Sequence, residues 1–240
     1  MGRSLYYITL MPFFHKKPFF VVAMFSAAAL PAFQSASPGV HPVSGRQYAH
    51  VMGVAGASWL ERPERDAEEN PQAAIDALGL EPGMVVCDLG AGSGYYSIRM
   101  AKKVGPQGKV YAVDVQPGMI QLLEKRIKSD KIRNIQPVLS TPSDPKLPAA
   151  EIDLMILVDV YHELDQPQEM LRKIRKSLKD SGRLVLLEFR KEDKNVPIRL
   201  EHKMSVAEVK QELEAEGFTI TEVKEHLPWQ HMFFLKKKLN

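Results

Sequence analysis

Cysteine is almost absent from this sequence: Cys87 is the only one in 240 residues. A single thiol excludes an intramolecular disulfide, a cysteine-based zinc site and a Cys-x-x-Cys redox pair. Cys87 lies inside an apolar run, so we interpret it as a small buried hydrophobic residue and not as a catalytic thiol.

A strong excess of basic charge is also missing. The formal net charge is +3, and Arg3, Lys16 and Lys17, which are the only charged residues among the first forty, account for all of it. A nucleic-acid-binding domain carries a basic bias over its surface, so we expect no nucleic-acid partner. We interpret the basic tail Lys236–Lys238 as a solvated chain end.

The N-terminus does carry a long apolar run. Residues 18–33 are mostly apolar, His15-Lys16-Lys17 precede them, and the small residues Ser35-Ala36-Ser37 follow. This order is typical of a secretory signal, and the run is shorter than the roughly 20 residues of a membrane span. We therefore predict that residues 1–37 are a cleaved signal peptide and that the protein is exported, to the periplasm or beyond. An uncleaved anchor, with membrane association through the N-terminus only, and a cytoplasmic extension are the alternatives.

From about residue 70, apolar runs alternate with helical patterns. Short apolar runs predict strands at Met84–Leu89, Lys109–Val115, Ile135–Leu139, Ile152–Val160, Arg183–Phe189, Phe218–Val223 and Met232–Leu235. Helical spacing and end signals predict helices over Ala73–Leu78, Tyr96–Val104, from Pro117, over Met170–Leu178 closed by Gly182, and from Ser205 to Gly217. Five strand–helix repeats followed by two strands predict a Rossmann-like α/β fold. Its seven-stranded sheet is mostly parallel with a last antiparallel strand, and helices cover both faces. We expect one domain over 70–240, preceded by a cap or lid over 38–69.

The turn after the first strand reads Asp88-Leu89-Gly90-Ala91-Gly92-Ser93-Gly94. Three glycines on alternate residues allow a tight turn and leave no Cβ between the backbone and a ligand. A dinucleotide fingerprint needs a further glycine where this chain has Tyr95, which argues against a nicotinamide-dependent oxidoreductase. The carboxylate of Asp88 suits a cationic amino-acid ligand and would repel a pyrophosphate.

A second acidic residue, Asp114, ends the second strand. A carboxylate at this place accepts two hydrogen bonds from a ribose diol. A surface-turn aspartate before Pro117 is the alternative, and the glycine turn upstream favours the ribose role.

With these motifs, the segment from about Asn70 to Leu235 resembles class I S-adenosylmethionine-dependent methyltransferases. Within them it is similar to the small-molecule branch that includes ubiquinone/menaquinone and arsenite methyltransferases, and more similar still to bacterial members with leader peptides. The resemblance implies S-adenosylmethionine as cofactor and a small-molecule acceptor. It implies a cofactor site formed by Asp88, Gly90, Gly92, Gly94, Asp114, Asp144 and Asp159. For Asp144, in Ser143-Asp144-Pro145, an adenine contact and a plain turn aspartate are both open.

The segment Asp159-Val160-Tyr161-His162-Glu163 follows the fourth strand, where such enzymes face cofactor and substrate. His162 is the candidate general base, because its ordinary pKa suits proton transfer, with a backbone-bonded histidine as the alternative. Tyr161 is predicted either to stack on the acceptor or to pack in the core. We interpret Glu163 as a helix N-terminal charge.

Other polar or aromatic residues are weaker candidates for this region. His202 and His231 are candidate pocket-lining residues, and we expect no metal site from them. Glu188 and Arg190 either bind an anionic acceptor or pair with each other. Trp59 belongs either to a lid over the cofactor or to ordinary packing. A non-catalytic module that binds S-adenosylmethionine or a partner is the alternative function.

Overall fold

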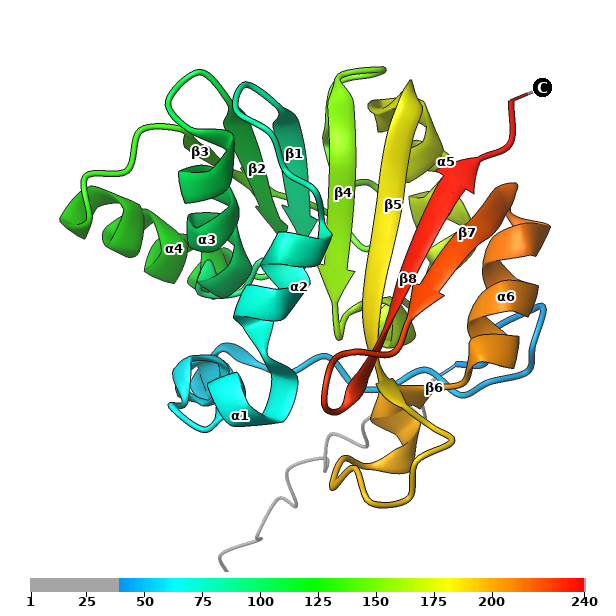
Figure 1. The fold of residues 1–240 in the computed structure, drawn as a ribbon. Helices are drawn as coiled ribbons and strands as arrows, with labels where there is room; N and C mark the ends of the chain where they lie inside the picture. The colour runs from blue at the N-terminus through cyan, green and yellow to red at the C-terminus, as the bar shows by residue number, and fades with distance from the viewer. Residues whose placement is uncertain (1–38, 240) are drawn as a thin grey trace, which may run out of the picture. The chain divides into compact units, whose positions relative to one another are not determined.

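The computed structural model describes residues 39–239 (Figure 1). The predicted signal peptide lies outside these residues, as does the first residue of the predicted cap. Within the described range, each helix is too short or too polar to cross a membrane.

An eight-stranded sheet runs through the described part of the chain. Its strands are β1 (Val85–Leu89), β2 (Lys109–Asp114), β3 (Ile135–Leu139), β4 (Ile152–Val158), β5 (Leu178–Arg190), β6 (Lys203–Met204), β7 (Phe218–Lys224) and β8 (Gln230–Lys237). The order is β3-β2-β1-β4-β5-β8-β7, and β6 pairs with β5 beside this path. Strands β1 to β5 pair in parallel, whereas β8 is antiparallel to both β5 and β7. The predicted Rossmann-like sheet is confirmed, including the antiparallel last strand.

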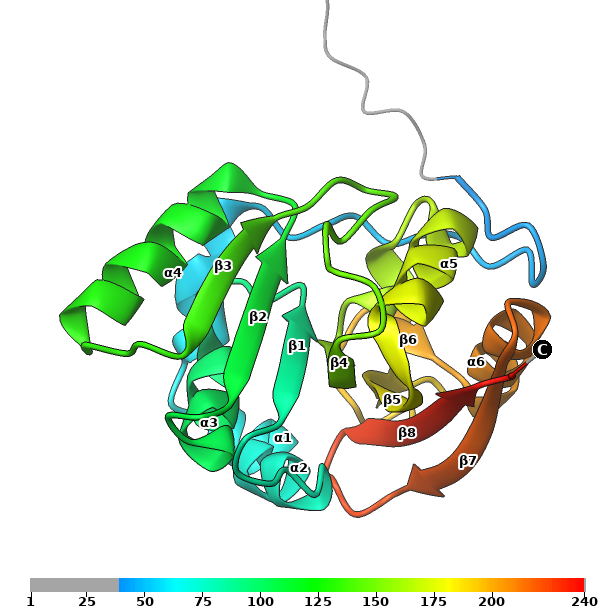
Figure 2. The same ribbon diagram turned by 90° about the horizontal axis from the view of Figure 1, so that it is seen from above.

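Helices cover both faces of the sheet (Figures 1 and 2). They are α1 (Arg65–Glu69), α2 (Pro71–Ala77), α3 (Tyr95–Val104), α4 (Pro117–Ser129), α5 (Pro167–Ser177) and α6 (Val206–Ala215), with short 3-10 turns η1 (Val54–Glu61), η2 (Tyr161–Glu163) and η3 (Leu200–His202). One core layer joins α2 and α3 to the sheet, and the other joins α5 and α6 to it. Because strand side chains alternate, Val86 enters the first layer and Cys87, fully buried as predicted, enters the second.

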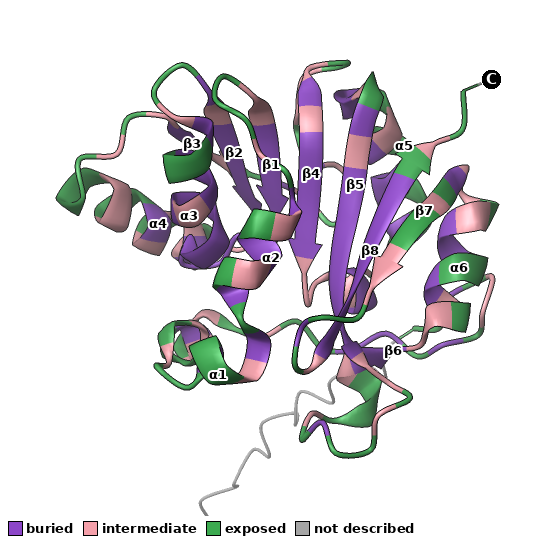
Figure 3. Ribbon diagram, in the orientation of Figure 1, coloured by how far each residue is buried: buried purple, intermediate pink, exposed green. Residues whose placement is uncertain are grey.

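The central strands are buried on both sides (Figure 3). Ile152, Leu154, Met155, Ile156 and Leu157 of β4 are all fully buried, which explains why this strand is apolar apart from Asp153. Local signals also place helix ends correctly. Ser205 forms a capping box with Glu208, and Gly79 and Gly217 adopt positive φ just after their helices.

Two expectations about this region are wrong in detail, and one short strand was not predicted. Gly182 does not close a helix, because α5 ends at Ser177 and β5 begins at Leu178. Gly182 lies at an irregularity in the β4–β5 pairing, where a Cβ would sit 2.8 Å from the carbonyl oxygen of Ile152. The third strand is followed by a loop and the isolated bridge Thr141–Asp144, so only four of the expected five repeats contain a helix. The two-residue strand β6 was not predicted, because it is too short to leave an apolar pattern.

Candidate functional site

The carboxyl ends of the parallel strands meet at one edge of the sheet. Residues Leu89, Asp114, Val158 and Arg190 end β1, β2, β4 and β5. In Figure 1 the arrowhead of β4 points toward the part of the molecule where α1 and the residues before it lie. In an open α/β sheet this edge holds the ligand site, and here it has two halves, one around the glycine turn and one around His162.

The glycine turn follows β1 and opens α3. Gly90, Gly92 and Gly94 have φ of +81°, +53° and +88°, a region that glycine enters without steric cost. A Cβ on Gly90 would lie 2.3 Å from Cγ2 of Val160, so this turn packs directly against the residues that follow β4. The turn therefore requires glycine for backbone conformation and for close approach, as the sequence motif predicts.

Asp114 links the glycine turn to the end of β2. Its Oδ2 accepts a hydrogen bond from the Gly92 amide at 2.9 Å, and its Oδ1 accepts one from the Gln116 amide at 2.8 Å. Burial raises the pKa of this carboxyl, and these backbone amides oppose the shift. Each oxygen retains a lone pair beyond these bonds, so the ribose role stays a chemically sound prediction.

Asp88 is buried below the turn. Its Oδ2 accepts a hydrogen bond from the Ser97 hydroxyl at 2.6 Å, in the first turn of α3. Burial raises the pKa of Asp88 to about 6, against the lowering effect of Ser97. Asp88 thus anchors α3 to β1, and its role toward the cofactor stays a prediction.

The N-terminal segment lies over the glycine turn. A Cβ on Gly92 would meet Cδ1 of Leu60 at 2.7 Å, and the Ser93 hydroxyl donates to Glu61 Oε1 at 2.5 Å. Trp59, by contrast, is 42% exposed, with its ring stacked on the Arg62 guanidinium at 3.6 Å. The lid contact is therefore made by Leu60 and Glu61, while Trp59 lies on the outer surface.

Asp159 stands between the two halves of the edge. It has a φ of +53°, and its Oδ2 accepts a hydrogen bond from Gln230 Nε2 at 2.7 Å. Its Oδ1 is buried and has no hydrogen-bond partner among the described residues. Burial, together with the carboxylates of Glu69 and Glu188, raises its pKa well above the ordinary value. An orphaned acceptor beside the glycine turn fits a ligand that donates hydrogen bonds, as the amino-acid ammonium of S-adenosylmethionine does.

Asp144 is occupied by its own turn. Its Oδ1 accepts a hydrogen bond from the Lys146 amide at 2.8 Å, and its Oδ2 lies 3.5 Å from Nζ of both Lys146 and Lys173. These contacts favour the plain turn aspartate, and the adenine role of Asp144 stays a prediction.

On the other half of the edge, His162 forms a buried polar cluster. The Nδ1–H of His162 donates to Glu188 Oε2 at 2.6 Å, and the Tyr161 amide donates to Glu188 Oε1 at 3.0 Å. His162 Nε2 lies 3.1 Å from Nδ1 of His202, and Glu163 lies 3.9 Å from that same His202 nitrogen. Burial raises the pKa of Glu163 to about 7. Glu163 therefore belongs to this cluster and does not begin a regular helix as expected.

Tyr161 is fully buried. Its hydroxyl lies 3.4 Å from His41 Nε2, and the Arg46 guanidinium lies 5.9 Å from its ring. Arg46 makes two 3.0 Å bonds to the fully buried Glu212 of α6 and a third to the carbonyl oxygen of His162. Full burial favours the packing alternative for Tyr161. The sequence showed no sign of this Arg46–Glu212 pair, which joins segments 166 residues apart.

The remaining candidates do not join the His162 cluster. His231 bridges the carboxylates of Glu225 and Glu192 at 2.7 and 2.9 Å. Arg190 forms a strand-end ion pair, as one alternative had it, but its partner is Glu225 and not Glu188. Glu188 turns instead to His162.

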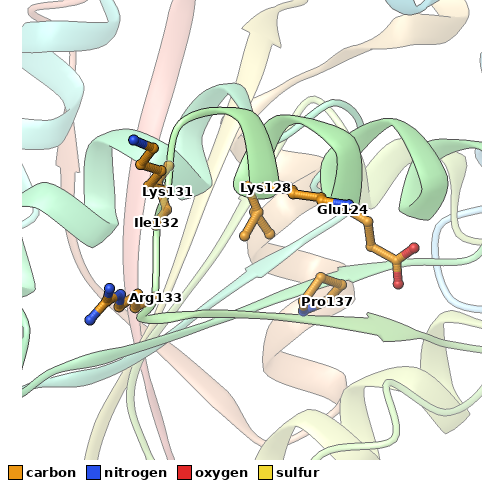
Figure 4. Close-up of a pocket in the computed structure, with 7 residues that line it drawn as sticks. Glu124, Lys128, Lys131, Ile132, Arg133 and Pro137 are labelled. Atoms are coloured by element: carbon orange, nitrogen blue, oxygen red, sulfur yellow. The ribbon is translucent and has the colours of Figure 1, made fainter.

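A surface pocket of about 420 Å³ lies at the other end of the sheet (Figure 4). It is lined by Glu124, Ile127, Lys128, Lys131, Ile132, Arg133 and Pro137. These residues lie on the second half of α4, in the loop that leads to the amino end of β3, and on β3 itself. The pocket is therefore separate from the site at the carboxyl edge.

Known proteins resemble this chain in sequence and in fold. A family model described as "Methyltransferase domain" matches residues 80–233. The ubiquinone/menaquinone biosynthesis C-methyltransferase UbiE of Hydrogenovibrio crunogenus is 29% identical over 119 residues, which are 49% of this chain and 47% of that protein. A protein-L-isoaspartate O-methyltransferase of Methanothrix thermoacetophila is 27% identical over 111 residues, which are 46% of this chain and 50% of that protein. The matches thus span about half the length of these curated relatives.

Among solved structures, a SAM-dependent methyltransferase from Aquifex aeolicus superposes with a TM-score of 0.73 at 26% identity. The match covers 77% of this chain and 98% of the other. A type 11 methyltransferase from Sulfolobus solfataricus shares the fold, with a TM-score of 0.60 at 19% identity over 72% of this chain and 95% of the other. The resemblance predicted from the glycine turn is confirmed: the chain belongs to the methyltransferase domain family and has the fold of class I S-adenosylmethionine-dependent methyltransferases.

Proposed function

We propose that this protein transfers the methyl group of S-adenosylmethionine to a small-molecule acceptor. The observation that carries the proposal is the glycine turn with Asp114 hydrogen-bonded across it, at the carboxyl edge of the family's sheet. The similarity to UbiE supports a small acceptor.

We call the half of the carboxyl edge formed by the glycine turn, Asp114 and Asp159 the cofactor half. Its residues have distinct roles in this proposal. Gly90, Gly92 and Gly94 let the ligand lie against the backbone, Asp114 accepts hydrogen bonds from the ribose, and Asp159 Oδ1 accepts one from the ammonium group. When bound, S-adenosylmethionine supplies a methyl group activated by the positive sulfonium. The protein's main contribution is then to align the acceptor with that methyl and to exclude water. Leu60 and Glu61 cover the turn on its open side.

We call the half formed by His162, Glu163, Glu188 and His202 the acceptor half. His162 is its candidate base. Glu188 can only accept a hydrogen bond while it is ionised, so it holds the proton on Nδ1 and leaves the Nε2 lone pair directed at the cluster. A base is needed only for an acceptor that loses a proton as it is methylated.

Titration calorimetry with S-adenosylmethionine and S-adenosylhomocysteine tests the cofactor step. We expect micromolar dissociation constants, about −8 kcal/mol. Asp114→Ala should weaken binding at least tenfold, because it removes the acceptor for the ribose and for the Gly92 amide. Asp130→Asn, at the exposed end of α4, is the matched control and should bind as the wild type does. Absence of binding by the wild type refutes the proposal.

Formation of S-adenosylhomocysteine in the presence of an acceptor panel tests turnover. Binding without turnover across quinone, phenol, thiol and amine acceptors would support the non-catalytic alternative. The family match favours turnover.

We further propose that residues 1–37 direct export, and that the exported protein meets its acceptor outside the cytosol. The basic, apolar and small-residue segments support this proposal. Mass spectrometry of the mature N-terminus tests it: a start near Pro38 supports cleavage, and an intact Met1 in the membrane fraction supports an anchor. Because S-adenosylmethionine is made in the cytosol, export would require that the cofactor be supplied.

A further inference from the structure

A group of three potential metal ligands lies at the acceptor half of the site. One ligand atom from each of His162, Glu163 and His202 lies within 4.8 Å of the other two. We propose that these residues bind a divalent transition-metal cation of the Zn²⁺ class. This site goes beyond the proposed methyl transfer, because the cofactor half requires no metal.

The orientation of His162 is the first argument. Its Nδ1–H is held by Glu188 Oε2 at 2.6 Å, and Glu188 is fully buried. Histidines that bind metals usually donate their other ring N–H to a carboxylate or carbonyl, which fixes the tautomer and makes the free nitrogen a better ligand. His162 Nε2 therefore presents a lone pair that is fixed in direction.

The approach of His202 is the second argument. Its Nδ1 lies 3.1 Å from His162 Nε2, with the two rings at 87° to each other. Two nitrogens, each about 2.0–2.1 Å from a tetrahedral zinc ion, lie roughly 3.3 Å apart. The observed separation is close to this value. An imidazole–imidazole hydrogen bond is the competing explanation, and the experiment below distinguishes the two.

The carboxylate of Glu163 completes the group. It lies 3.9 Å from His202 Nδ1, and its side chain is mostly buried. Two imidazoles and one carboxylate form the ligand set of several catalytic zinc sites, in which the fourth position stays open to water or substrate. The Glu163 carboxylate also accepts a backbone hydrogen bond from Met52, and its remaining lone pairs are available to a cation.

The position of the cluster in the fold indicates which part of the site the cation would face. Val160, two residues before His162, packs on Gly90 of the cofactor turn, and His202 directly precedes β6, which pairs with the end of β5. The open coordination position therefore belongs to the acceptor half of the site. A cation on Nε2 would make His162 a ligand and exclude it as the proton acceptor.

Calorimetric titration of the chelator-treated, tag-free protein with ZnCl₂ tests the site. We expect one ion per chain with a submicromolar dissociation constant. His202→Ala, at a partly exposed residue, should weaken binding at least 30-fold, and Glu163→Gln at least tenfold. His50→Ala replaces an exposed histidine outside the cluster and should change binding less than twofold.

Cobalt substitution gives an independent readout. Co²⁺ bound by two imidazoles and a carboxylate should show visible d–d absorption that His202→Ala abolishes. Zinc binding that is weaker than about 100 µM, or that His202→Ala leaves unchanged, overturns the proposal and leaves the histidine hydrogen bond as the explanation. S-adenosylhomocysteine binding, measured on the same metal-free protein, reports on the cofactor half separately, so a failure of the metal site would leave the proposed function testable.

Discussion

The two halves of the carboxyl edge differ in whether backbone or side-chain groups form them. The cofactor half consists mainly of backbone: three glycines at positive φ, two amides held by Asp114, and Leu60 against the turn. The acceptor half consists of buried ionisable side chains, in which Glu188 holds His162, and Glu212 holds Arg46.

This difference has a physical reason. Backbone recognition requires a particular conformation, which a few glycines and one aspartate specify locally. Buried charges require partners, because an unpaired charge in the core costs several kcal/mol. The cofactor half should therefore be sensitive to added volume, and the acceptor half to removal of one member of a pair. Four predictions test this comparison, from the largest expected effect to the smallest.

Arg46→Met should lower the free energy of unfolding by about 3–5 kcal/mol, because it leaves the buried Glu212 without its guanidinium partner. Urea denaturation measures the loss. The double variant Arg46→Met/Glu212→Leu, which removes both charges, should recover at least half of it. S-adenosylhomocysteine affinity should stay within threefold of the wild type for the folded single variant. A loss below 1 kcal/mol would show that the pair is not buried as described.

Gly90→Ala should lower the affinity for the cofactor product, which Arg46→Met should leave nearly unchanged. The positive φ costs about 1–2 kcal/mol for an L-residue, and contact with Val160 adds about 1–3 kcal/mol. Calorimetry should show at least 30-fold weaker S-adenosylhomocysteine binding. Gly45→Ala has a similar φ of +73° but open space around its Cβ, so it should incur only the conformational cost and bind normally. Equal behaviour of the two variants would contradict the close-approach argument, and Val160→Ala should partly rescue Gly90→Ala.

The pH dependence of Asp88 tests a buried charge beneath the cofactor turn. Its pKa is raised to about 6 by burial, so the folded protein binds a proton at a higher pH than the unfolded chain does. Its ionised form therefore destabilises the fold at pH 7, and this penalty is relieved as the pH falls through 6. As the pH is lowered from 7 to 5, the free energy of unfolding of the wild type should rise by about 1 kcal/mol relative to that of Asp88→Asn. Parallel stability curves for the two proteins would show that the pKa is not raised.

Trp59→Ala should have the smallest effect. The ring is exposed and stacks only on Arg62, a contact that contributes about 0.5–1 kcal/mol at an exposed site. Thermal unfolding and S-adenosylhomocysteine binding should change little, with less than a twofold effect on affinity. Leu60→Ala, which removes the side chain that contacts Gly92, should weaken binding several-fold. The reverse order would make Trp59 the functional part of the lid.

Much of the fold followed from local pattern. The nearly continuous apolar run of β4, the capping box at Ser205 and the glycine after α6 each act within a few residues, so the sequence predicted them at nearly the right positions. The failures lie where tertiary contacts overrule a local signal. Gly182 resembles a helix end in the sequence, but it lies inside β5. Because glycine has no Cβ, the carbonyl oxygen of Ile152 can approach it at the irregular pairing of β4 with β5.

The same distinction holds for the site. The sequence by itself determined the glycine turn and Asp114, because spacing along one strand–turn–helix unit encodes them. Only the tertiary structure joined His162 to Glu188 and His202, which lie 26 and 40 residues away, and Arg46 to Glu212, 166 residues away. The partner of a buried polar residue depends on how elements that are distant in the sequence pack together. Such a pair leaves no periodic pattern in the sequence from which the partner could be predicted.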